Sequence, residues 1–244
     1  WGSAATSTQG EYTSEAEAVD DRSFNYDKVS NGQEGLTILF AAGNDGPGAG
    51  TVGSPSTAKN VVTVGNHQAR YSGAPDNLMS GSSRGPTDDG RIKPDIIAPG
   101  GYVRSCRAQE AQDIGGSSWQ STWYLEYTGT SMATPNAAGA ATLIREYLME
   151  IAQRPSPQGA LVKALLVLGA TDINARDIPN NDEGWGRVNL KETLAPSQGR
   201  GIWVDDRSVL TSSGASKSYV FNVTYANSQL KAVLAWSDYR GSRF

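Results

Sequence analysis

The chain has 244 residues, of which 38% are hydrophobic and 19% are charged, and its formal net charge is −4. This composition is typical of a globular protein that can bury a core, and the mild acidity without a basic stripe argues against nucleic acid or an anionic membrane as a partner. No apolar run approaches the ~20 residues that a membrane-spanning helix needs. The one cysteine, Cys106, excludes an intrachain disulfide.

Three apolar runs predict strands that are buried on both faces of a parallel sheet. They are Leu36–Ala42, Val61–Gly65 and the shorter Asp95–Ala98. Before them, residues 3–32 are polar and predict surface loop, with a short helix around Ser14–Asp20.

Parallel neighbours need helical connections, and the two strongest helical patterns follow the strands. They span about Ser131–Ala152 and Ser156–Leu168. In the second helix, we expect Ser156 to be the cap and Pro157 the first helical residue.

The pattern changes after about residue 195. Residues 196–200 resemble a linker, and strand-like alternation follows at Gly201–Asp205, Tyr219–Tyr225 and Leu230–Trp236. We therefore expect an α/β domain over residues 1–196 and, over residues 201–244, the first strands of a truncated β-sandwich. Because the chain starts at Trp1 rather than Met, we expect it to be an internal piece of a longer protein.

The stretch GTSMATP, Gly129–Pro135, is followed by small and apolar residues. Thr130 and Ser131 are typical helix-starting residues, and Pro135 is tolerated only in a first turn. A helix N-terminus carries partial positive charge and free N–H groups, so a hydroxyl there faces a site suited to a developing anion. The alternative is an ordinary core helix capped by serine or threonine.

Two further segments lie upstream of GTSMATP. The first, Phe40–Pro47, contains AAGN and closes a predicted strand with a Gly-Asn turn; the second comprises Ser83–Pro86 and Lys93–Gly100. In this order the three segments resemble those of the subtilisin-like serine proteases, or subtilases, for which GTSMATP and AAGN are specific signatures. The resemblance covers about residues 1–195, where a Gly-rich turn at 181–190 matches the closing segment of the catalytic domain.

The resemblance implies an α/β fold with three layers, in which a parallel sheet is flanked by helices. The chain would hold the C-terminal part of that domain. The order of the segments and the trailing β-rich region are most similar to those of the large bacterial alkaline subtilases.

The resemblance also implies the site of a serine endopeptidase. Ser131 matches the nucleophile, and Asn44 matches the amide that, with the backbone N–H of Ser131, forms the oxyanion hole. The substrate-binding residues that the family pattern implies are Ala41, Ala42, Gly43, Gly53, Gly129 and Thr130. The alternative for both Asn44 and Gly53 is an ordinary turn.

The general base and its orienting acid have no match. His67 is the only histidine, and it lacks the HGT context of the family's base, so we predict a surface or loop position for it. Asp45 and Asp95 belong to other family segments. We expect the catalytic Asp and His to lie upstream of Trp1, and the chain alone to be inactive. A non-catalytic pseudoprotease or peptide-binding module is the alternative.

The predicted chemistry requires no cofactor. An acidic loop offers ligands for a structural Ca²⁺ ion, or is a solvated turn; its polar residues are Asp177, Asn180, Asp182 and Glu183. Asn136 replaces a histidine that many subtilases carry outside the triad. The resemblance implies a secreted, extracellular monomer that acts on polypeptides, with no nucleic acid or membrane partner.

Overall fold

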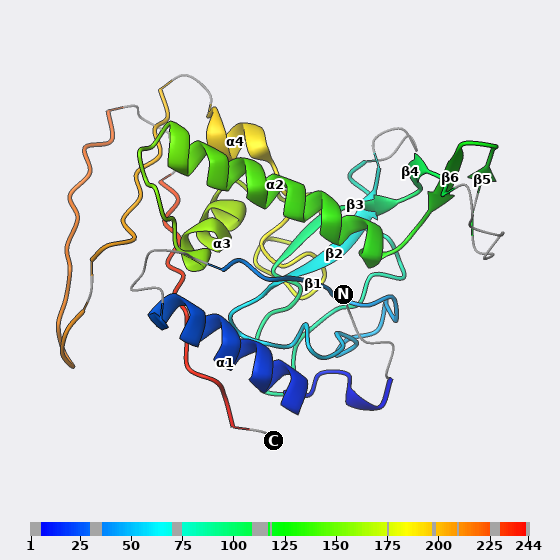
Figure 1. Ribbon diagram of the computed structural model, residues 1–244, viewed down its shortest axis with the longest axis horizontal. Helices are drawn as coiled ribbons and strands as arrows, with labels where there is room; N and C mark the ends of the chain where they lie inside the picture. Colours follow the sequence, from blue (N-terminus) through cyan, green and yellow to red (C-terminus); the bar gives the residue numbers. More distant parts are fainter. Residues whose placement is uncertain are drawn as a thin grey trace.

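The computed structural model describes residues 6–29, 36–69, 75–108, 117, 119–174, 176–196, 199–208, 210–224 and 230–242. A short 3-10 turn (Thr6–Thr8) precedes the first helix, and Figure 1 shows the elements that follow. The helices are α1 (Ser14–Val29), α2 (Thr130–Glu150), α3 (Gly159–Leu168) and α4 (Leu190–Leu194). The strands are β1 (Leu39–Ala41), β2 (Val62–Gln68), β3 (Ile96–Gly101), β4 (Val103–Cys106), β5 (Trp119–Gln120) and β6 (Tyr124–Tyr127).

The three predicted apolar runs form one parallel sheet in the order β1-β2-β3. Alternate residues of these strands belong to two separate cores, because successive side chains of a strand point to opposite faces. The first core, between the sheet and helices α2 and α3, includes Leu39, Val62, Val64, Ile96 and Ala98. The second, beneath α1, includes Ile38, Phe40 and Val61. The expected three-layer α/β arrangement is therefore confirmed.

Helix α2 crosses the sheet in Figure 1 and approaches β3 closely. One face of the helix is buried, and its buried residues include the alanines Ala133, Ala137, Ala140 and Ala141. A Cβ atom on Gly100 of β3 would lie 2.8 Å from the Ala133 Cβ and 2.6 Å from the Gly129 carbonyl oxygen. Small residues on both elements therefore let the start of α2 lie directly against the end of β3.

The predicted helix ends were wrong in two places. Helix α1 runs on to Val29 instead of ending near Asp20. Helix α3 begins at Gly159, with Gln158 as its cap, and not at Pro157. The Pro157 carbonyl instead accepts a hydrogen bond of 3.2 Å from Arg145 of α2, so a tertiary contact outweighs the local start signal.

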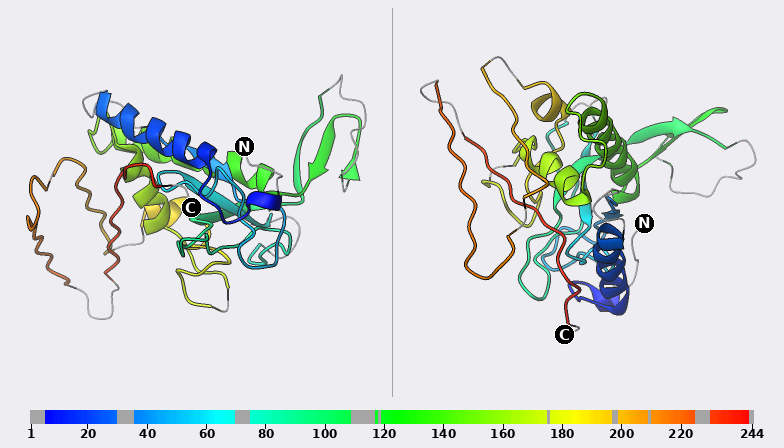
Figure 2. Two further views of the ribbon diagram at one scale, coloured as in Figure 1. Left: turned by 90° about the horizontal axis from the view of Figure 1, so that it is seen from below. Right: turned by 60° about the vertical axis from the view of Figure 1, so that its left-hand side comes forward.

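A second sheet, in the order β4-β6-β5, was not expected from the sequence. Its strands are antiparallel, and they form an arm that projects away from the body of the molecule in both views of Figure 2. The arm follows β3 directly and leads directly into α2.

The expected strands of a β-sandwich are not formed in the described residues of 199–242. A strand exists only when a neighbour completes its ladder, and no described residue of this segment belongs to one. Val220 is 98% exposed and Leu234 is 83% exposed. The segment is nevertheless tied to the body, for example by an ion pair of 2.7 Å between Lys59 and Asp238. The division into two domains stays a prediction.

No helix in the described part of the chain combines the length and the apolar character needed to cross a bilayer.

Candidate active site

The Gly-Asn turn follows β1 and is held from the side by Ser83. Gly43 has a φ of 112°, a backbone conformation that favours glycine, and a Cβ there would lie 2.7 Å from the Ser83 Oγ. The Ser83 N–H donates to the Gly43 carbonyl at 3.0 Å, and the Ser83 Oγ accepts from the Asp45 N–H at 3.1 Å. Ser83 is fully buried, and these two bonds hold the backbone on both sides of Asn44.

Asn44 reaches across to the start of helix α2. Its Oδ1 accepts two hydrogen bonds from Thr130, one from the backbone N–H at 2.9 Å and one from the Oγ1 hydroxyl at 3.1 Å. The Thr130 Oγ1 in turn accepts from the Gly43 N–H at 3.3 Å. Because a backbone N–H can only donate, the amide atom facing it is the oxygen, which leaves Nδ2 of Asn44 as a donor on the other side.

Ser131 is exposed on the first turn of α2, directly after Thr130. The N-cap is Gly129, and no side chain caps the helix, so the alternative of a simple serine or threonine cap does not describe this helix start. Within the described residues, neither the hydroxyl nor the backbone N–H of Ser131 has a hydrogen-bond partner. Both groups are therefore available to a molecule that binds beside Asn44.

Thr130 was predicted to bind substrate, and its contacts in the structure are different. Its side chain is fully buried and makes the two contacts to the Gly43–Asn44 turn, so it faces the protein and not a substrate. The sequence motif includes Thr130 but does not reveal this function. Ser83 was likewise part of a recognised segment without an assigned role.

Three hydrogen bonds fix the start of α2 to the end of β3. The Gly129 N–H donates to the Gly100 carbonyl at 2.9 Å, and the Tyr102 N–H donates to the Thr128 Oγ1 at 2.8 Å. Nδ2 of Asn136 donates to the Pro99 carbonyl at 2.8 Å and also to the Met132 carbonyl at 3.1 Å. Asn136 thus holds the turn of the helix that follows Ser131.

The predicted wall of the substrate cleft lies at the end of β1. The Ala41 and Ala42 side chains are buried, and the Ala42 N–H donates to the Val64 carbonyl at 2.9 Å. Gly53 is buried next to them, and its N–H donates to the Ala42 carbonyl at 3.2 Å. The structure therefore brings Gly53 against Ala42. Of the four residues of AAGN, Gly43 is partly exposed and Asn44 is exposed.

The prediction of a surface or loop position for His67 was wrong. His67 lies within β2 and is 2% exposed, and its burial holds the imidazole pKa below its usual value. The preceding Asn66 faces the start of α2, because its Cβ lies 2.6 Å from the position of a Cβ on Gly100. Successive strand residues point to opposite faces, so His67 is directed away from the face that carries Ser131.

Asp95 anchors the opposite end of β3 and has no place near Ser131. It pairs with Lys93 at 2.7 Å and with Lys163 at 2.9 Å, and it accepts the Thr63 N–H at 2.7 Å. The two lysines hold the pKa of Asp95 at about 2, whereas burial lowers the pKa of Lys93 to about 8. This cluster is a structural support for β2 and β3.

Two carboxylates of the acidic loop, those of Asp182 and Glu183, have protein partners. Asp182 pairs with Arg84 at 3.1 Å and with Arg176 at 3.5 Å. Glu183 is fully buried and accepts from the Ile173 N–H at 3.2 Å; its burial raises the pKa of the carboxyl. No cluster of three or more candidate metal ligands exists among the residues that the structure describes.

Comparison with known proteins assigns the family. The model of the subtilase family, peptidase S8, matches residues 1–186, and the chain therefore belongs to the subtilase family. Serine protease AprX of Bacillus subtilis is 39% identical over 164 residues, which are 66% of this chain and 35% of AprX. Pyrolysin of Pyrococcus furiosus is 31% identical over an alignment of 186 residues, and the match covers 65% of this chain and 12% of pyrolysin.

The chain thus spans 35% and 12% of the lengths of these two relatives. Among solved structures, a lanthipeptide protease aligns with a TM-score of 0.52 and 23% identity, covering 73% of this chain and 54% of that one. This likeness supports the subtilisin-like fold.

Proposed function

We propose that the chain is the nucleophile-bearing part of a serine endopeptidase. The observation that carries the proposal is the double hydrogen bond from Thr130 to Oδ1 of Asn44. With Oδ1 held by Thr130, the amide donor of Asn44 is left for a ligand next to the residue that precedes Ser131. Among the described residues the Ser131 N–H has no hydrogen-bond partner, and together these observations support an oxyanion hole at this point.

In the proposed reaction, the Ser131 Oγ attacks the carbonyl carbon of the scissile peptide bond and gives its proton to a histidine base. The carbonyl oxygen becomes an oxyanion and accepts hydrogen bonds from the Ser131 N–H and from Nδ2 of Asn44. The histidine then protonates the leaving amine, and water hydrolyses the acyl-enzyme by the same steps in reverse order.

The histidine and the aspartate that orients it are proposed to come from sequence that precedes Trp1. His67 is directed to the other face of the sheet, and Asp95 is held by two lysines at the far end of β3. We therefore expect residues 1–244 alone to be inactive. The complete protease, meaning this chain joined to the part that carries the base, is proposed to be a secreted monomer that acts on polypeptides and requires no cofactor.

The test compares the complete protease with its Ser131→Ala variant. Loss of the nucleophile should lower turnover of a peptide anilide by ~10⁶-fold, the scale set by subtilisin itself. Ser213→Ala, at an exposed position in the C-terminal segment, serves as the matched control and should keep full activity. Normal turnover by the Ser131→Ala protein would reject the nucleophile assignment.

Labelling with an organophosphate tests the proposed division of the triad. The complete protease should be labelled at Ser131, and residues 1–244 alone should not, because the serine lacks its base. Rapid labelling of residues 1–244 would show that the base lies within this chain. No labelling of either protein would favour a pseudoprotease that only binds peptides.

A further inference from the structure

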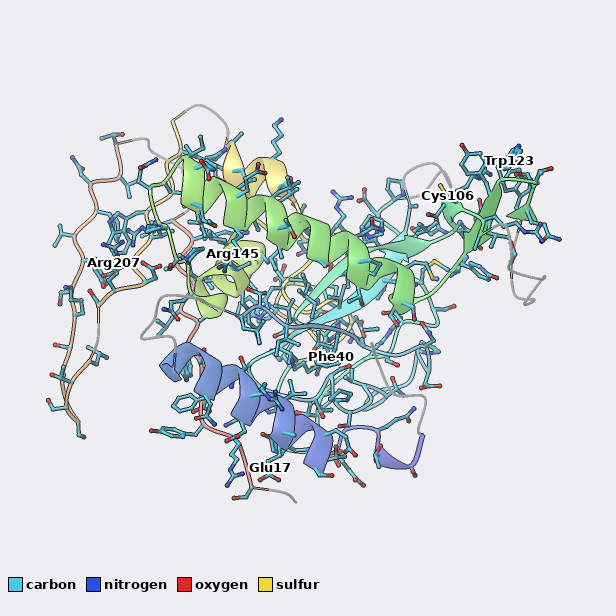
Figure 3. All side chains as sticks on the ribbon, viewed as in Figure 1. Glu17, Phe40, Cys106, Trp123, Arg145 and Arg207 are labelled. Carbon is cyan, nitrogen blue, oxygen red and sulfur yellow. The ribbon has the colours of Figure 1, made fainter. Side chains whose placement is uncertain are left out.

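The arm formed by β4, β6 and β5 presents exposed aromatic side chains. Trp123 is 62% exposed, Tyr124 is 49% exposed and Trp119 is 40% exposed. Figure 3 shows Trp123 on the part of the arm farthest from the body, with Cys106 closer in. Large exposed aromatic side chains that a hydrogen-bonded sheet carries are typical of binding surfaces.

The charges on this sheet are largely neutralised within it. The ladder pairs Arg104 with Glu126 and Glu126 with Trp119, so the three side chains lie in one row. Arg104 forms an ion pair of 3.3 Å with Glu126, and its guanidinium lies 3.9 Å from the ring centre of Trp119. The surface therefore favours an apolar or aromatic ligand over a strongly charged one.

The arm is connected to the candidate site without an intervening loop. Strand β6 ends at Tyr127, four positions before Ser131, and β4 begins two positions after the end of β3. The bonds from Tyr102 to Thr128 and from Gly129 to Gly100 close the base of the arm. The base of the arm therefore lies next to the start of α2, which carries Ser131.

The strand order decides which part of a substrate would reach the arm. The predicted wall for the residue before the scissile bond follows β1, at one edge of the sheet, and the arm follows β3, at the other edge. The start of α2 contacts both sides, through Thr130 to Asn44 and through Gly129 to Gly100. A peptide that lies against the β1 side and crosses Ser131 therefore leaves in the direction of β3 and the arm.

We propose that the arm binds the segment of the polypeptide substrate that follows the scissile bond, and that it selects apolar or aromatic side chains there. This proposal rests on the proposed function and specifies its substrate class. Tyr124 lies three residues beyond Tyr127 along β6, which is about 10 Å at ~3.3 Å per residue. The selected side chains should therefore lie several residues downstream of the cleaved bond.

The test uses two substrates with the same acyl side in the complete protease. One ends in p-nitroanilide and has no residue after the scissile bond; the other continues for six residues that include leucine and phenylalanine. Trp123→Ala and Tyr124→Ala should each lower kcat/KM for the long peptide about fivefold or more, mainly through KM. Both should leave hydrolysis of the anilide unchanged. Trp236→Ala, at a site 65% exposed outside the arm, is the matched control and should change neither substrate.

Three outcomes would overturn the proposal. They are an unchanged kcat/KM for the long peptide, an equal fall for both substrates, and an equal fall for a long peptide whose downstream residues are serine and glycine. Equal falls would mean that the arm supports the fold of the site or binds backbone without selecting side chains. Unchanged kinetics would leave the aromatic surface to a membrane or to a second copy of the chain.

A binding measurement separates this proposal from the proposed function. In the complete protease carrying Ser131→Ala, a fluorescent peptide with the downstream sequence should bind, and Trp123→Ala should weaken its binding about fivefold. Absence of anilide hydrolysis by the unmutated complete protease would defeat the proposed function alone. Equal binding with and without Trp123 would defeat the role of the arm alone.

Discussion

Oδ1 of Asn44 accepts both the N–H and the hydroxyl of Thr130, although the two residues are 86 positions apart. The contact joins the turn after β1 to the first residue of α2. It replaces the side-chain cap that the helix itself lacks, and it determines which atom of the amide faces outward.

We expect the hydroxyl of Thr130 to affect kcat by positioning Asn44. Thr130→Val keeps the backbone bond to Oδ1 but removes both contacts of the hydroxyl, so we expect kcat of the complete protease to fall about tenfold with little change in KM. Thr130→Ser should restore most of the rate. Asn44→Ala should cost ~10²–10³-fold in kcat, the effect of removing the corresponding amide in a subtilisin.

A double variant checks this explanation. If Thr130 acts only by positioning Asn44, then Asn44→Ala combined with Thr130→Val should be no slower than Asn44→Ala alone. Additive losses in the double variant would show that Thr130 has a separate function.

We expect Asn136 to position the helix turn that carries Ser131. Asn136→Ala removes the donors to the Pro99 and Met132 carbonyls, and we expect a loss of about 1 kcal/mol in unfolding free energy and a several-fold fall in kcat. Thr142→Ala is the control, because the exposed Thr142 hydroxyl donates to the Ala138 carbonyl of the same helix and not to β3. Urea denaturation and anilide kinetics measure the two effects, and a change in stability without any change in kcat would contradict the positioning role.

The charge cluster around Asp95 should contribute strongly to stability. Asp95→Asn leaves the buried ammonium of Lys93 without its counter-charge, so we expect a loss of about 3–5 kcal/mol. Asp89→Asn breaks a pair with Arg91 at a more exposed site, and there the loss should stay below about 1 kcal/mol. Chemical denaturation of both variants would decide, and similar losses for the two would refute the special status of Asp95.

His67 should make the protein less stable in acid. Because burial lowers its folded-state pKa, the unfolded chain binds a proton near pH 6.5 that the folded chain does not yet bind. Stability therefore falls as the pH drops below about 6.5, by at most ~1.4 kcal/mol per pH unit from this group. His67→Gln should show a shallower fall between pH 7.5 and 5.5. An identical slope in both proteins would mean that His67 titrates normally.

The parallel sheet was predictable because its strands are apolar on both faces. Val62 and Val64 face one core and Val61 the other, which is the pattern of a continuous apolar run. The same criterion placed the predicted end of β2 at Gly65, whereas the strand continues to Gln68. The strand continues through polar residues because the Asn66 N–H and the strand ladder have partners inside the protein, such as the Ser82 Oγ at 3.0 Å.

The arm and the C-terminal segment show where a hydrophobic pattern fails to predict strands. In the arm, the ladder of β4, β5 and β6 consists mostly of exposed residues, so no buried face left an alternating signal. In the C-terminal segment, Tyr219–Thr224 alternates as a strand would, yet its residues are exposed and have no ladder. Alternation indicates a preference for the extended chain, and pairing depends on a neighbour.

The site also divides into a predictable and an unpredictable part. Short motifs predict Ser131 and Asn44 as site residues, because each residue type carries its own chemistry, and these assignments stay predictions. The supporting residues Thr130 and Ser83 act through tertiary bonds, and only the folded arrangement of β1 and α2 reveals them.

The dependence of the helix start on a distant amide has a consequence for the newly made protein. During synthesis the turn after β1 is complete long before Ser131 emerges, but the two meet only when the sheet has closed and α2 has settled on it. Until then the hydroxyl has no amide beside it to stabilise an oxyanion. The proposed protease would therefore lack its oxyanion hole until the sheet and α2 have folded together.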